Sequence, residues 1–162
     1  MTSKTSTDTF TLAGAARLIE AKQLSPVELT QALLERVETY NPRLDAFITQ
    51  TAELAMTQAK AAEAQIAGGN YRGPMHGIPF GLKDIYNTKG ILTTGHSRTA
   101  IDNVPTEDAF TTAKLFEAGG VLMGKLATHE YAHGGPSFDL PCPPAAAPGL
   151  SRARGRSLRT RT

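Results

Sequence analysis

The sequence predicts an α/β protein in which helices lie against a sheet. Amphipathic stretches with helical spacing alternate along the chain with brief apolar runs, and Gly or Pro closes most of them. The chain has 162 residues, and 40% of them are hydrophobic. This length and apolar content suit one globular domain with a core of its own.

Two helices are expected at the start of the chain. Thr11 can cap a helix from Leu12 to about Lys22, because apolar residues recur there at three- and four-residue spacing. Ser25 begins a capping-box pattern with Pro at the first helical position, and an apolar stripe follows. We expect this second helix to stop at Asn41-Pro42, since the residue before proline disfavours helical geometry.

The next elements alternate between strands and helices. Strands are predicted at 46–49, within 75–85 and at 121–125, where short apolar runs occur. Helices are predicted over 52–67 and from about 109 to 118, and two glycines follow each of them. Lys83 falls near the end of the middle strand.

The composition changes after residue 144. The last eleven residues hold five of the 17 basic residues and no acid, so 12 basic residues face 15 acidic ones in the remainder, a net charge of −3. Residues 145–162 contain too few large apolar side chains to offset the entropy lost on ordering. We therefore divide the chain into a folded part, 1–144, and a basic tail, 145–162, that we expect to be disordered.

Two stretches carry a resemblance to a known family. They are Gly73-Pro74-Met75-His76-Gly77-Ile78-Pro79-Phe80-Gly81-Leu82-Lys83-Asp84 and Gly119-Gly120-Val121-Leu122-Met123-Gly124-Lys125, the latter followed by His129-Glu130-Tyr131-Ala132. The chain resembles the amino-terminal part of an amidase-signature enzyme from roughly Leu12 to Pro144. The resemblance implies a partial fold of that family, with helices packed on an incomplete mixed sheet.

The resemblance also implies a chemistry. The family hydrolyses non-peptide carboxamides, or transfers the amide nitrogen, with a Ser-cisSer-Lys triad, and Lys83 matches its lysine. A lysine that acts as a base must be neutral although a free one titrates near ~10.4, so we expect burial in an apolar setting. Strand alternation would place Lys83 and Asp84 on opposite faces. Taken alone, Leu-Lys-Asp would describe a surface lysine beside an acid.

The serines of that triad are missing where the family has them. Where its Gly/Ser-rich segment should follow, the chain reads Ala145-Ala146-Ala147-Pro148-Gly149-Leu150-Ser151 and then becomes Arg-rich. A base without a nucleophile and oxyanion donors forms no acyl-enzyme, so we predict a truncated protein that is inactive by itself. A frameshift or premature end in a longer gene would explain the change.

Other residues admit other chemistry. His129, Glu130 and His133 satisfy the His-Glu-x-x-His pattern of zinc peptidases, but glycines and a proline follow at once, and we interpret the match as coincidence. Ser97 and Ser137 are better explained by local turn hydrogen bonds than as nucleophiles. We therefore assign no metal and no cofactor.

Two alternatives to a hydrolase stay open. One is a component of a transamidase that converts glutamyl-tRNA, since it would share the lysine motif. The other is a small binding module whose arginine tail contacts nucleic acid, although the tail lacks aromatic residues. The expected partner is a small amide, which would be the substrate of the full-length enzyme. We expect no contact with a membrane, and we rank nucleic-acid binding below amide hydrolysis. The lone Cys142 and the absence of an apolar leader favour the cytoplasm. The sequence gives no oligomeric state.

Overall fold

A computed structural model describes residues 11–134 of the chain. Within that range the helices are α1 (Leu12–Glu20), α2 (Pro26–Leu44), α3 (Ala52–Ala67) and α4 (Phe110–Glu117), and the strands are β1 (Phe47–Gln50), β2 (Pro79–Lys83) and β3 (Val121–Leu126). Two short 3-10 turns lie at Arg98–Ala100 and Glu130–Ala132. The α/β prediction is confirmed, whereas the expected tail and Ser137 lie outside the described residues.

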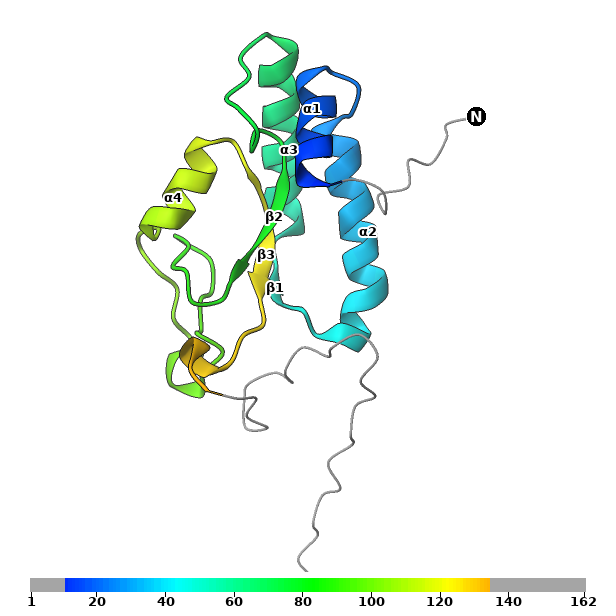
Figure 1. Cartoon of the computed structure of the whole chain (residues 1–162). Coiled ribbons are helices and arrows are strands. Elements are labelled where there is room, and N and C mark those ends of the chain that lie inside the picture. The colour runs from blue at the N-terminus through cyan, green and yellow to red at the C-terminus, as the bar shows by residue number, and fades with distance from the viewer. Residues whose placement is uncertain (1–10, 135–162) are drawn as a thin grey trace, which may run out of the picture.

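The three strands form one mixed sheet. Their order is β1-β3-β2, with β3 antiparallel to β1 and parallel to β2. Figure 1 shows α1, α2 and α3 gathered on one side of the strands and α4 on the other. The described part of the sheet therefore has β3 at its centre and β2 at an edge.

Thr11 and Ser25 accept N-cap hydrogen bonds, as the sequence predicts. The Thr11 side chain accepts from the N–H of Gly14, and Ser25 Oγ accepts from the N–H groups of Val27 and Glu28. The Ser25 hydroxyl also donates to a carboxylate oxygen of Glu63 on α3. This cap thus satisfies the start of α2 and ties α2 to α3.

The prediction that α2 stops at Asn41-Pro42 is wrong. The helix contains Pro42 and ends at Leu44, where Asp45 adopts a left-handed conformation with φ of 50°. A proline removes its own N–H donor, while the Asn41 side chain bonds to both the N–H and the carbonyl of Phe47. These tertiary bonds hold the last turn together and lead directly into β1, one residue later than predicted.

The core has two parts, one mainly among α1, α2 and α3 and one between α3 and the sheet. One cluster contains Ile19, Leu24, Leu29, Ile66 and Ile78, and a second joins Ala55 and Ala59 of α3 to Val121 of β3. Small alanines on α3 allow that helix to lie close to the sheet. In residues 11–134, no helix combines the length and the apolar content needed to cross a bilayer.

Candidate functional site

Lys83 is the last residue of β2 and its side chain is exposed. Asp84, the next residue, is completely buried. The two side chains therefore lie in opposite environments, as strand alternation predicts. The expected burial of Lys83, however, is wrong for this chain, because the residue ends an edge strand that has no further strand beside it within residues 11–134.

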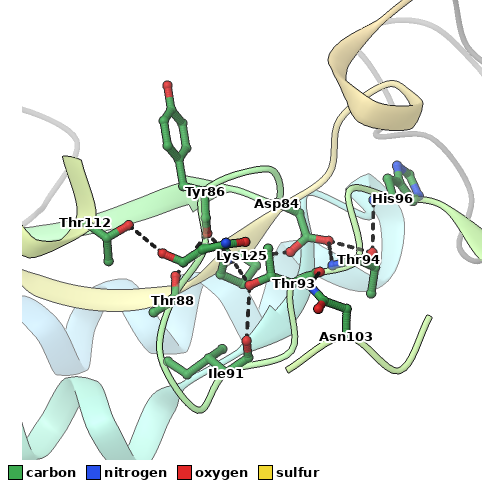
Figure 2. Close-up of polar contacts among 11 residues, drawn as sticks. Asp84, Tyr86, Thr88, Ile91, Thr93, Thr94, His96, Asn103, Thr112 and Lys125 are labelled. Carbon is green, nitrogen blue, oxygen red and sulfur yellow. Dashed lines mark hydrogen bonds and ion pairs between the residues drawn. The ribbon is translucent and has the colours of Figure 1, made fainter. Parts of the chain in front are cut away.

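The buried lysine of the sheet is Lys125, near the end of the central strand β3. Its side chain has no exposed surface. The ammonium group donates to the carbonyl of Tyr86 at 2.7 Å and to Thr93 Oγ1 at 2.6 Å (Figure 2). Its third contact is Oδ1 of Asp84, which lies 3.5 Å away and forms a buried ion pair.

Asp84 fixes the start of the segment that follows β2. Its Oδ2 accepts from the N–H of Thr94 at 2.9 Å and from Thr94 Oγ1 at 2.6 Å. Its backbone N–H donates to Leu126 and its carbonyl accepts from Gly95. Among the described residues, the other carboxylate oxygen, Oδ1, has no hydrogen-bond partner and lies 3.5 Å from the Lys125 ammonium nitrogen.

Two opposing effects act on the Lys125 ammonium. Burial disfavours its charged form and lowers the pKa, while the charge of Asp84 raises it. Burial is the larger effect, so the pKa of Lys125 lies below that of a free lysine. The group donates hydrogen bonds to two oxygen acceptors and forms an ion pair with one carboxylate.

The segment between β2 and the first 3-10 turn is folded back on itself. Thr93 Oγ1 donates to the carbonyl of Ile91, and the Thr93 carbonyl accepts from the Asn103 side chain. Thr88 Oγ1 donates to the Tyr86 carbonyl at 3.2 Å. Buried hydroxyls thus satisfy the backbone of a stretch without strand or helix, and this stretch covers Lys125.

A second set of bonds joins this segment to residues 128–132. Ser97 Oγ accepts from the N–H of Thr99 and donates to Glu130 at 2.6 Å. Thr99 Oγ1 lies 2.6 Å from the Tyr131 hydroxyl, and the Tyr131 N–H donates to the Gly95 carbonyl. The local role predicted for Ser97 is confirmed.

The His-Glu-x-x-His stretch forms a 3-10 turn at Glu130–Ala132 instead of the helix that a zinc peptidase needs. Glu130 is engaged by Ser97. Between residues 11 and 134, no three His, Cys, Asp or Glu side chains gather closely enough to hold a metal ion.

The sequence predicts Lys83 as the site residue, and this stays a prediction; the buried Lys125 and its contact with Asp84 were missed. A signal was available, because a lysine inside the apolar run Val121–Leu126 has no polar side of the strand to occupy. A charged residue in a strand that is buried on both faces is expected to have a partner of opposite charge or hydrogen-bond acceptors.

Comparison with known proteins supports the resemblance to the amidase-signature family. Residues 28–137 match the model of the amidase family. The A subunit of glutamyl-tRNA(Gln) amidotransferase from Geobacter sp. (strain M21) is 42% identical over 146 residues, which are 83% of this chain and 30% of that protein. The corresponding protein from Geobacter metallireducens (strain ATCC 53774 / DSM 7210 / GS-15) is 47% identical over 116 residues, 72% of this chain and 24% of that protein.

Solved structures share the fold. The native peptide amidase from Stenotrophomonas maltophilia superposes with a TM-score of 0.72 at 31% identity, over 80% of this chain and 26% of its own. A fatty acid amide hydrolase superposes with a TM-score of 0.70 at 26% identity, over 74% of this chain and 21% of its own. The chain thus spans 30% or less of the length of these four proteins.

Proposed function

The chain belongs to the amidase family, and from that premise we propose that it is the lysine-bearing part of an enzyme that hydrolyses carboxamide C–N bonds. Lys83 would be the base of a Ser-cisSer-Lys triad, taking a proton through a bridging serine from the nucleophilic serine. The acyl-enzyme would then form with release of the amine. Both serines would have to come from outside residues 11–134.

The observation that carries this proposal is the separation of Lys83 from its neighbouring acid. Asp84 is buried and turned to Lys125 and Thr94, so its carboxylate is committed to other partners. Lys83 leaves the sheet on the exposed side, at the end of a strand. An amine in that position is open to a serine presented by another segment.

The chain alone would be inactive for a physical reason. A neutral lysine base requires a dry, apolar setting, and Lys83 is exposed here. An apolar groove of about 240 Å³ also opens between α2 and the sheet, and its wall includes Leu33, Val37, Leu44, Phe47 and Met123. Further polypeptide packed on the sheet would cover such surfaces and supply the serines.

The identity of the relatives favours one variant of this proposal. Two proteins that are 42% and 47% identical to this chain are, by name, A subunits of glutamyl-tRNA(Gln) amidotransferase. In a transamidase of that kind, the serine that the same lysine activates would attack the side-chain amide of glutamine, and the ammonia that leaves would be transferred. Glutamine would then be hydrolysed in preference to simple carboxamides.

The test is an ammonia-release assay on three proteins. The first is the 162-residue chain. The second, called the extended protein below, joins residues 1–137 to the matching remainder of the Geobacter sp. (strain M21) relative. The third is the extended protein with Lys83→Ala. We expect turnover from the second alone, and a preference for glutamine over simple carboxamides would select the transamidase. Turnover by the 162-residue chain, or an unaffected Lys83→Ala protein, would overturn the proposal.

A further inference from the structure

Burying the Asp84–Lys125 pair under the segment after β2 carries a large desolvation cost. Both side chains have no exposed surface, so each loses its hydration on folding. Apolar residues of similar volume often replace such a pair without loss of stability. A purely stabilising role therefore explains the pair poorly, and its contacts indicate what else it does.

Those contacts converge on the residue that follows Lys83. The Asp84 side chain holds Thr94, and its backbone holds Leu126 and Gly95. Lys125 donates hydrogen bonds to the Tyr86 carbonyl and to the Thr93 hydroxyl of the same segment. The Lys83 carbonyl itself accepts from the N–H of Tyr86 at 3.1 Å. The backbone on the carboxyl side of Lys83 is thus fixed by a network centred on two charges.

From this arrangement we infer that Lys125 is a positioning residue for Lys83. Through the ion pair with Asp84, it fixes the end of β2 and with it the direction in which the Lys83 side chain leaves the sheet. Lys125 is on the same side as Asp84, opposite to Lys83, so it does not touch the reacting groups. The inference rests on the proposed function of Lys83 and adds a second lysine to that site.

The experiment compares the charged pair with a neutral one. Asp84→Asn/Lys125→Met removes both charges together and leaves no single buried charge behind. Thr93→Val is a milder variant that keeps the pair and removes one acceptor of the ammonium. Lys89→Met is the matched control, because Lys89 is an exposed lysine of the same segment.

Amide hydrogen exchange on the 162-residue chain reports the positioning directly. In the double variant we expect the Thr94 and Gly95 amides to exchange at least tenfold faster, with the amides of α3 unchanged. Thr93→Val should accelerate the same two amides about threefold, and Lys89→Met should leave them unchanged. This local pattern differs from a general loss of stability, which would accelerate all amides.

Turnover by the extended protein supplies the functional readout. The double variant should lower kcat at least tenfold with KM within twofold, because a misdirected base impairs chemistry and not substrate binding. Wild-type kcat in a folded double variant, together with unchanged exchange in Thr93→Val, would overturn the inference alone. A Lys83→Ala protein as active as its parent would instead overturn the proposed function and this inference with it.

Discussion

Replacing Gly119 by alanine tests how tightly the turn after α4 packs on His76. Gly119 has a φ of +82°, and a Cβ there would lie 2.3 Å from Cδ2 of the His76 ring. The ring cannot retreat easily, because it is buried and its two nitrogens contact Arg72 N and Gln65 Oε1, each at 3.1 Å. A left-handed alanine costs about 1 kcal/mol and an overpacked core about 1–3 kcal/mol. We expect Gly119→Ala to lower the free energy of unfolding by about 2–4 kcal/mol.

Gly69 provides a matched control for the backbone term. It follows α3 with a φ of +86°, and no atom of residues 11–134 lies within 4 Å of a Cβ built there. Gly69→Ala should therefore cost only about 1 kcal/mol. Urea unfolding of the 162-residue chain, followed by far-UV circular dichroism, gives both values. Equal losses in the two variants would refute the packing argument, as would a Gly119→Ala/His76→Ala protein whose loss equals the sum of the single losses.

Three further predictions use the same urea assay. Burial lowers the pKa of His76, and the Arg72 charge adds to this, so the unfolded chain binds the proton first. The resulting stabilisation is complete above pH ~6.5 and is lost as the pH falls below it, and the unfolding midpoint should drop more between pH 7.5 and 5.5 in the parent than in His76→Gln; equal drops would contradict this. Ser25→Ala should cost about 1–2 kcal/mol because two N–H groups lose their acceptor, and a loss no larger than that of Thr11→Ala would argue against the double cap. Lys125→Met leaves the Asp84 charge buried without its cation and should cost about 3–5 kcal/mol, whereas Lys89→Met should be neutral; similar values for the two would refute a buried ion pair.

The elements that local chemistry determines could be predicted from the sequence. The helix predicted over 52–67 is α3 (Ala52–Ala67), and the strand predicted at 121–125 is the start of β3. The Ala-rich helix ends at a pair of glycines, and the apolar strand begins directly after another pair. No distant contact is therefore needed to place these boundaries. The caps at Thr11 and Ser25 are local for the same reason.

The parts that were predicted wrongly or missed depend on specific side-chain contacts that no local sequence pattern encodes. The last turn of α2 survives Pro42 because Asn41 reaches Phe47 across the loop. The network around Lys125 joins residues that are 32 to 41 positions apart in the sequence. Hydrophobic periodicity does not predict which residues form such pairs. A lysine within an otherwise apolar strand does indicate that it has a buried polar partner.

The two lysines differ in burial because their strands occupy different places in the sheet. Alternation along a strand tells which side chains share a face, but the order of strands in the sheet decides which face is covered. β3 lies between β1 and β2, and the segment that leaves β2 contacts Lys125 through Asp84, Tyr86 and Thr93 and so encloses it. Within residues 11–134, Lys83 ends an edge strand, and polypeptide packed beside or above β2 would be needed to exclude water from it. The same strand order therefore buries the positioning lysine within this chain and leaves the burial of the proposed base to the part that would also carry its serines.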